Sequence, residues 1–276
     1  MRQAAVLSLC PLMLGAFAAY AFDGKPLPDP GQLKQRAIAN MKKSEEALER
    51  YSCLVHAQYE ELNGDGGVKK RETRRLERFF VNGAKIDHVL ARDGKDLNGR
   101  DAKKEQDRVD KEVKKFSDLK EVSKRQDRAE RQLDMFLRAQ RLTNGRRETR
   151  NGRSTVIYDL IGDPGFRPTN LEERFAQAVT GRLWMDEEAG TPVELRIETR
   201  RDVKIGGGLL ANLHKGFALR LTQQRQPEGV WLTKSVNGNG DVRAGLFFHP
   251  RFRFKEELDN CRLFSVESKD LLHEPK

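Results

Sequence analysis

Apolar and polar residues alternate through most of the second half of the chain. Leu183 and Met185 alternate with arginine, tryptophan and aspartate, and the same period recurs at 193–197 and 217–222. A period of two places every second side chain on the same face of a β-strand. These runs therefore predict antiparallel strands with one apolar face and one face in water.

Turn-forming residues separate the alternating runs. An acidic stretch ending in glycine stands at 187–190, Pro-Glu-Gly at 227–229 and Asn-Gly-Asn-Gly at 237–240. Glycine and asparagine tolerate the positive φ that tight turns need, so each stretch predicts a chain reversal. Two more strands are expected at 251–255 and 260–266. The apolar face of such a sheet must be covered by curling of the sheet, by helices or by a ligand.

The first third of the chain predicts a helix followed by a three-stranded meander. Apolar residues recur at helical spacing between 32 and 51, with lysine and glutamate elsewhere. Strand-like runs then cover 53–62, 68–81 and 85–92. Asn-Gly-Asp-Gly-Gly separates the first two runs and Asn-Gly separates the second two, which is typical of hairpins.

The segment from about 100 to 142 has a different character. It is rich in charged residues and glutamine, has no glycine or proline, and carries apolar residues at helical spacing. We expect two helices with a break near 117–123. Two interpretations are open: a solvent-exposed insertion held by two short apolar patches, or a lid over a cavity.

Asn-Gly pairs at 144–145 and 151–152 predict turns that return the chain to strands. A strand is expected at 154–161 and a short helix from 171 to 178. Glu173 stands three residues after Asn170, which is the spacing of a capping box at the start of this helix.

The first 21 residues have the three-part pattern of a secretory signal. A short positive start precedes an apolar run from 4 to 19, and small residues occupy the positions that a signal peptidase reads before a cut after Ala21. Pro11 and Gly15 interrupt the apolar run, which is shorter than the ~20 residues of a spanning helix. We therefore expect cleavage at this point, and a single periplasmic domain formed by 22–276.

The formal net charge of the chain is +10, and its basic residues are spread among acidic neighbours. The export signal argues against a nucleic-acid partner. A basic exported protein can instead make peripheral contact with anionic lipid headgroups.

Three cysteines are present, and Cys10 leaves with the signal. Cys53 and Cys261 stand near the two ends of the mature chain, and thiols in an oxidising compartment can pair. A disulfide between them would tie the first strand to the last. Two separately buried thiols are the alternative.

The search for catalytic and metal-binding motifs finds none. No two histidines have metal-ligand spacing on one predicted helix, and neither His-Glu-x-x-His nor Gly-x-Ser-x-Gly occurs. The triple glycine at 206–208 lacks the Lys-Ser or Lys-Thr of a phosphate loop, and the carboxylates at 186–188 lie at a predicted turn. The sequence therefore predicts no catalytic residue, no metal and no cofactor.

An apolar sheet face is the remaining candidate for a binding site. Eight alternating side chains are expected to line it: Leu183, Met185, Val193, Leu195, Ile197, Phe217, Leu219 and Leu221. They form either an ordinary core covered by the 32–51 helix or a surface that holds a ligand.

Several motifs occur in a familiar order. Tyr51-x-Cys53 opens a predicted strand. Asp93-Gly94-Lys95 follows a predicted hairpin and precedes the helical insertion. Two later motifs form a predicted pair of strands: Gly181-Arg182-Leu183-Trp184-Met185-Asp186 and Val193-x-Leu195-x-Ile197. This order resembles that of the outer-membrane lipoprotein-sorting and periplasmic lipoprotein carrier (LolA-like) family, in a divergent bacterial branch.

The resemblance implies a mainly β, α+β fold: an open antiparallel half-barrel of curved sheet with covering helices. It also implies an apolar interior that holds acyl chains of lipids or lipoproteins. We therefore expect a non-enzymatic periplasmic binding or carrier protein. An envelope-sensing or scaffold protein that binds a partner through 100–142 is the alternative, and an exported hydrolase that unites His56, His88 or His249 with an acid and a nucleophile is a third.

Overall fold

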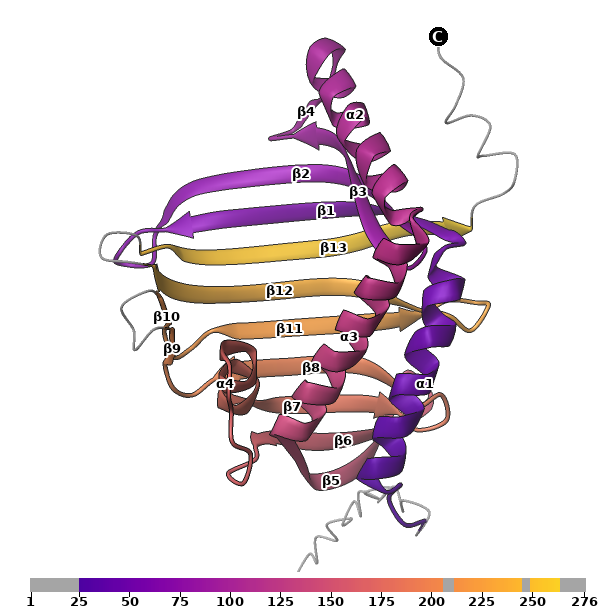
Figure 1. The fold of residues 1–276 in the computed structure, drawn as a ribbon, viewed down its shortest axis with the longest axis vertical. Coiled ribbons are helices and arrows are strands. Elements are labelled where there is room, and N and C mark those ends of the chain that lie inside the picture. Colours follow the sequence, from indigo (N-terminus) through magenta and orange to yellow (C-terminus); the bar gives the residue numbers. More distant parts are fainter. Residues whose placement is uncertain (1–24, 206–210, 245–248, 264–276) are drawn as a thin grey trace, which may run out of the picture.

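The computed structural model describes residues 25–205, 211–244 and 249–263 (Figure 1). The expected signal peptide and the triple glycine lie outside these residues. The strands are β1 (Tyr51–Leu62), β2 (Val68–Val81), β3 (Ala84–Arg92), β4 (Lys95–Asp96), β5 (Gln140–Arg150), β6 (Arg153–Gly162), β7 (Val179–Asp186), β8 (Thr191–Thr199), β9 (Val203–Ile205), β10 (Ala211–Leu213), β11 (Ala218–Arg225), β12 (Trp231–Ala244) and β13 (Arg251–Leu263).

The strands form one antiparallel sheet in the order β4-β3-β2-β1-β13-β12-β11-β8-β7-β6-β5, while β10 pairs with β12 and β9. The sheet is curved and does not close, because β4 and β5 stand at opposite ends of this order (Figure 1). The first strand β1 lies beside the last strand β13. The expected α+β class with an open sheet is confirmed.

The described residues form four helices beside the sheet: α1 (Pro30–Leu48), α2 (Gly99–Phe116), α3 (Leu119–Ala139) and α4 (Leu171–Ala178). Figure 1 shows α1 and α3 crossing the strands on one face of the sheet, with α4 beside them. The Asp29 side chain caps α1 by accepting from the Gln32 amide at 2.9 Å, and Asn170 caps α4 by accepting from the Glu173 amide at 2.9 Å. None of the helices formed by the described residues has the length and apolar character that a membrane crossing requires.

The strand register assigns side chains to the two sheet faces. Leu160, Gly181, Ile197, Leu219, Gly238 and Phe254 occupy directly opposed positions on six neighbouring strands, and so share one face. Phe136 of α3 and Phe175 of α4 pack against the cluster that includes Leu160 and Ile197, so this is the helix-covered face. The opposite face carries the arginine of each alternating run, and we call it the arginine face.

The disulfide predicted as one of two alternatives is present. Cys53 and Cys261 are bonded across β1 and β13, with a Cα–Cα distance of 4.0 Å and a sequence separation of 208. Cys53 is buried in a core cluster with Tyr51 and Val55, against which Leu48 of α1 packs. Cys261 is half-buried and packs against the same cluster, so the bond ties β1 to β13 at the edge of this core.

The helix α2 closes one edge of the sheet. Beyond β3 the sheet continues only as the two-residue β4. Glu105 of α2 accepts from the Val89 amide at 2.9 Å, and Arg108 donates to the Asp87 carbonyl oxygen. Unpaired strand edges are templates for aggregation, and these side chains occupy the backbone groups of that edge. The charged 100–142 segment forms α2 and α3: α2 protects β3, α3 covers the sheet, and the last residues of the segment belong to β5.

Two predicted turns are wrong. The Asn-Gly-Asn-Gly stretch at 237–240 lies within β12, which runs uninterrupted from Trp231 to Ala244. Asn144-Gly145 lies within β5, where the register with β6 shifts between Thr143 and Arg146. The Asn144-Gly145 stretch is a β-bulge. Asn144 has a φ of 51° there, and this positive φ is the same property that favours asparagine in turns.

Candidate ligand-binding site

Most of the predicted apolar side chains lie on the helix-covered face. Leu183, Leu195 and Leu219 pack around the buried cluster of Leu160, Val179 and Ile197. Leu221 is opposite Leu195 in the register, and Met185 is opposite the buried Val156. Ile197 and Met185 are buried, whereas Leu183, Leu195, Leu219 and Leu221 are only half-buried. This face is therefore partly core and partly accessible.

Val193 departs from the prediction. It packs with Ile157 and Trp184 in a separate cluster, and Trp231 joins them. The cause is a register shift between Trp184 and Met185, which pairs Trp184 with Glu194 but Met185 with Pro192. Val193 is the extra residue of this bulge, so strict alternation fails there and its side chain leaves the predicted row.

A cleft of about 440 Å³ opens between α3, α4 and the short strands β9 and β10. Its apolar lining comes from Met135 and Phe136 of α3, Leu171 and Phe175 of α4, and Val203 and Leu213 of the strands. Leu171 is 40% exposed at this cleft. Because Phe136 and Phe175 also contact the cluster on the sheet, the cleft adjoins the helix-covered face.

Aromatic rings extend this apolar surface across the sheet. Phe175 meets Phe217 edge-on with ring centroids 5.8 Å apart. Phe217 and Phe252 both stand over Gly240, where an added Cβ would lie 3.0 Å and 2.8 Å from their ring atoms. Phe252 in turn stacks with Tyr59 at 6.3 Å between centroids. We call the set Phe175, Phe217, Phe252, Phe254 and Tyr59 the aromatic strip, which leads from the cleft to β1.

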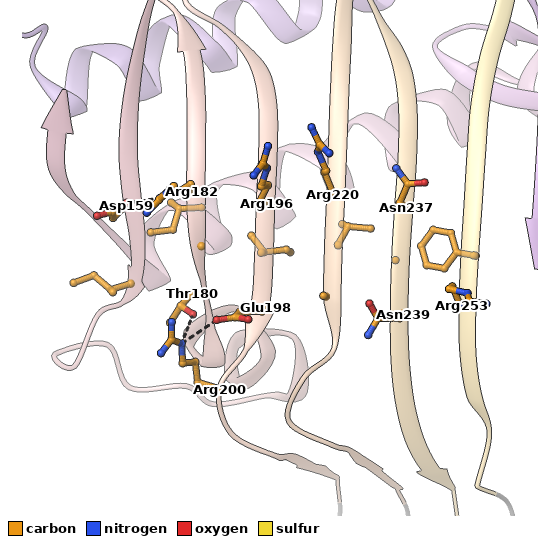
Figure 2. A pocket seen from close by; sticks show the side chains of 18 of the residues that line it. Asp159, Thr180, Arg182, Arg196, Glu198, Arg200, Arg220, Asn237, Asn239 and Arg253 are labelled. Atoms are coloured by element: carbon orange, nitrogen blue, oxygen red, sulfur yellow. Dashed lines mark hydrogen bonds and ion pairs between the residues drawn. The ribbon is translucent and has the colours of Figure 1, made fainter. Parts of the chain in front are cut away.

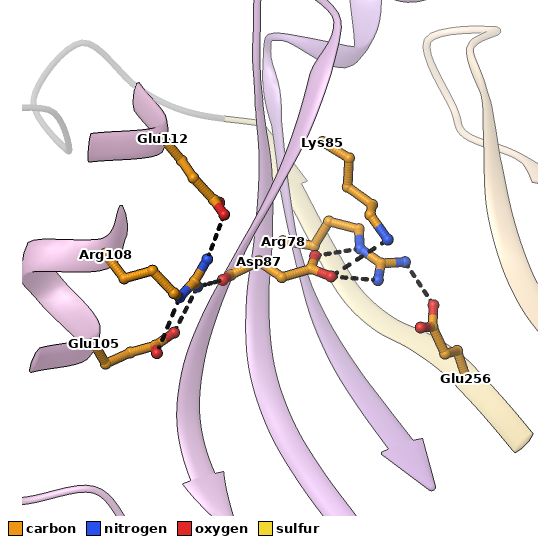
Figure 3. Close-up of polar contacts among 7 residues, drawn as sticks. All are labelled: Arg78, Lys85, Asp87, Glu105, Arg108, Glu112 and Glu256. Atoms are coloured by element: carbon orange, nitrogen blue, oxygen red, sulfur yellow. Dashed lines mark hydrogen bonds and ion pairs between the residues drawn. The ribbon is translucent and has the colours of Figure 1, made fainter. Parts of the chain in front are cut away.

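A network of charges on the same face has a structural role (Figure 3). Arg78 is buried and binds Asp87 through two hydrogen bonds of 2.6 and 2.9 Å, and it also lies 2.9 Å from Glu256. Burial raises the pKa of Asp87, but the hydrogen bonds and charge of Arg78 outweigh burial and hold this pKa below its usual range. The network links β2, β3 and β13 and leaves the carboxylate ionised.

The other titratable groups are dispersed. Burial, together with the hydrogen bond to Glu228, raises the pKa of Tyr51 to about 12. His56 is exposed on β1, His88 is half-buried on β3, and His214 lies 3.4 Å from Asp202. In the described part of the chain, histidine, cysteine and carboxylate side chains nowhere gather in a group of three that could hold a metal ion.

Sequence reasoning anticipated the helical half of the site only in outline. The 100–142 segment carries apolar residues at helical spacing, and a lid over a cavity was one of its two interpretations, but the pattern did not place Met135 and Phe136 at a cleft beside α4. The alternation of Phe252 and Phe254 with basic residues was visible, yet nothing in the sequence indicated that Gly240 would bring Phe252 to Phe217.

Comparison with known proteins gives weak similarities. No family model and no curated protein matches the sequence. The chain is similar to an outer membrane lipoprotein-sorting protein domain from Vibrio parahaemolyticus, at 13% identity and a TM-score of 0.34 over 87% of this chain and 98% of that one. It is also similar to a DUF1329 family protein from Desulfovibrio piger, at 11% identity and a TM-score of 0.32 over 86% and 95% of the two chains.

A third similar structure is MucB in complex with MucA(peri), at 10% identity and a TM-score of 0.25 over 86% of this chain and 100% of that one. The lipoprotein-sorting resemblance seen in the sequence thus recurs among solved structures. At these identities and TM-scores the similarity identifies no ligand.

Proposed function

We propose that this protein is a non-enzymatic periplasmic binding or carrier protein that holds an acyl chain of a lipid or lipoprotein. The chain would enter the cleft between α3 and α4 and lie along the helix-covered face. The observation that carries this proposal is the continuity of the apolar cleft with half-buried leucines and with the aromatic strip.

The size and chemistry of the cleft suit such a ligand. Its volume of about 440 Å³ falls in the range of about 300–1,000 Å³ that is common for ligand sites. Each CH₂ group moved from water into an apolar site contributes about 0.8 kcal/mol. An acyl chain therefore gains affinity along its length without any specific polar contact, which fits a lining that is almost entirely apolar.

Export to an oxidising compartment is supported by two independent features. The amino-terminal pattern is that of a secretory signal. The described structure holds a disulfide between Cys53 and Cys261, a bond that persists in oxidising compartments.

Uptake of a fluorescent fatty acyl probe tests the proposal, with Leu171→Arg as the key variant. Leu171 is 40% exposed and lines the cleft, so an arginine there places a charge in the path of the chain. Val68→Arg is the matched control, because Val68 is 42% exposed and lies at the start of β2, away from the cleft.

We expect Leu171→Arg to weaken probe binding at least about tenfold, which corresponds to 1.4 kcal/mol, while Val68→Arg leaves it unchanged. Native mass spectrometry of protein purified from the cell envelope should show a lipid adduct. Absence of both an adduct and probe uptake in the unmodified protein would refute the proposal.

A protein partner is the second candidate. Figure 1 shows α2 at the β3 end of the sheet, away from the cleft. Its Lys103, Lys104 and Asp107 are exposed. Because Glu105 and Arg108 hold β3, deleting the whole segment would damage the fold, so the sharper test is Lys103→Glu with Lys104→Glu. Loss of a co-purifying envelope protein with acyl uptake intact would favour the partner role.

A further inference from the structure

The arginine face carries like charges in directly opposed positions. Arg182 of β7 is opposite Arg196 of β8, and Arg196 is opposite Arg220 of β11. Like charges in this arrangement destabilise a sheet unless something compensates them. Figure 2 shows the three side chains in a row across the strands.

Buried carboxylates hold these arginines but do not neutralise them. Glu194 is 1% exposed and accepts hydrogen bonds from Arg196 and from Arg220, the latter at 2.8 Å. Arg150 donates to the same carboxylate. One negative charge is therefore shared by three guanidinium groups. Arg196 also lies over the Trp184 ring, 5.0 Å from its centroid, which fixes its position further.

The same arrangement recurs at both ends of the row. Asp159 lies 3.1 Å from Arg182 and 3.7 Å from Arg146. Glu60 is also 1% exposed and is bound by Arg71 and Arg253. In each case one carboxylate serves more than one guanidinium group. The arginines remain about half-exposed, at 49% for Arg220 and 54% for Arg182, so their free N–H groups face solvent.

A groove of about 1,010 Å³ runs over this row, from β5 to β1. Six basic side chains line it, whereas Asp159 and Glu198 are its acidic ones. The next row of side chains on this face includes the small Thr180 and Ala218, which lie beside Glu198 and Asn239 in the register, so the groove stays open beside the arginines. The groove is thus an elongated, positively charged depression with preorganised donors.

We propose that this groove binds a soluble anion that carries two or more phosphate groups. Guanidinium groups bind phosphate through paired N–H donors. Adjacent strands lie about 4.8 Å apart, so neighbouring arginines reach successive phosphates of one molecule. The site lies on the face opposite the acyl cleft, and the sheet separates the two, so it is independent of the proposed acyl binding.

Two other occupants fit the groove less well. An acidic peptide would gain no main-chain bonds over most of the groove, because the strands β6, β7, β8, β11, β12 and β13 are each paired on both sides and, of the described strands beneath it, β5 alone has an unpaired edge. A flat anionic membrane does not fill a depression. Both are kept as outcomes of the test.

Titration calorimetry with sodium tripolyphosphate at low ionic strength is the experiment. The variant is Arg182→Gln with Arg220→Gln. Glu194 keeps Arg150 and Arg196 as partners, and Asp159 keeps Asn144 and Arg146, so no buried carboxylate is left alone. The control is Arg74→Gln with Arg75→Gln, which removes the same charge from side chains that are 53% and 44% exposed on β2, outside the groove.

We expect tripolyphosphate to bind the unmodified protein, with a Kd that rises at least about tenfold in the groove variant and less than about twofold in the control. Added salt should weaken binding, since it screens exposed charges. No binding to the unmodified protein, or equal loss in both variants, would overturn the proposal. So would tighter binding of a polyglutamate peptide, or binding to phosphatidylglycerol vesicles that tripolyphosphate does not compete with. Acyl uptake should be unchanged in the groove variant.

Discussion

The ring of Phe254 lies directly against Gly238, so that a Cβ atom at Gly238 would stand 2.5 Å from the Phe254 Cε1 atom. The carbonyl oxygen of Ala218 would lie 3.0 Å from the same Cβ. A side chain at Gly238 therefore cannot be accommodated unless both the ring and the β11 backbone move. This contact explains why a glycine occurs inside a long strand, where glycine is otherwise unfavourable.

Replacing Gly238 with alanine should destabilise the protein. Overpacking of a filled site costs about 1–3 kcal/mol, and we expect a loss of that size in the free energy of unfolding measured with urea. Gly64→Ala is the control, because nothing lies within 4 Å of a Cβ added there. Equal stability of the two variants would show that the ring does not depend on the glycine.

Reduction of the disulfide should lower stability substantially. The Cys53–Cys261 bond closes a loop with a sequence separation of 208, and the chain-entropy model gives about 5 kcal/mol as an upper value. We expect the urea midpoint to fall when a reductant is added. The double variant Cys53→Ala with Cys261→Ala should show the low midpoint in both conditions, and a reductant effect in that variant would exclude the disulfide as its source.

Stability should decrease in acid. Burial raises the pKa of Glu194, but hydrogen bonds from Arg196, Arg150 and Arg220 outweigh burial, and the net pKa lies below its ordinary value of 4.5. A group with a lowered folded-state pKa contributes stability above its unfolded-state pKa and loses it as pH falls towards the folded-state pKa. We expect the free energy of unfolding to fall below about pH 4.5.

The variant Glu194→Gln isolates this contribution. It should be less stable at pH 7 by about 1–3 kcal/mol, because charged hydrogen bonds to the buried carboxylate are lost while the arginines stay partly solvated. Its stability should also change less between pH 5 and about pH 3 than that of the unmodified protein. A variant with an unchanged pH profile would assign the acid sensitivity to other carboxylates.

The protein should self-associate through the β3 edge of the sheet when α2 no longer covers that edge. Glu105 is buried and accepts from the Val89 amide. In Glu105→Ala this backbone donor loses its partner, and a free strand edge promotes pairing with other molecules. We expect increased light scattering and a higher average mass in solution. Lys111→Ala, on the exposed side of α2, should remain unchanged.

The fold could be predicted from sequence wherever side-chain chemistry and backbone conformation agree. The apolar–polar pattern at 193–197 and 217–222 located β8 and β11, although a bulge moves Val193 out of the row, and the Asn170 cap located α4. The predicted turns are wrong where glycine or asparagine, residues typical of turns, has another structural role inside a strand. Glycine at 238 and 240 supports aromatic packing instead of a turn, and Asn144 adopts its positive φ in a bulge.

The candidate site was predicted only in part for a related reason. The leucines of β7, β8 and β11 were placed on one face by their period. Phe136 and Phe175 could not be added, because their position depends on how α3 and α4 cross the sheet. The row of arginines and Glu194 follow from the same period, but the sharing of Glu194 by three arginines depends on which strands are neighbours in the sheet.

Photo-crosslinking with a fatty acyl probe that carries a diazirine near its methyl end tests acyl binding most directly. Digestion and mass spectrometry of the labelled protein would locate the chain. We expect adducts within α3 and α4, centred on Met135, Phe136 and Phe175, and their loss in Leu171→Arg. Adducts confined to the arginine face or to α2, or no specific adduct at all, would contradict acyl binding in this cleft.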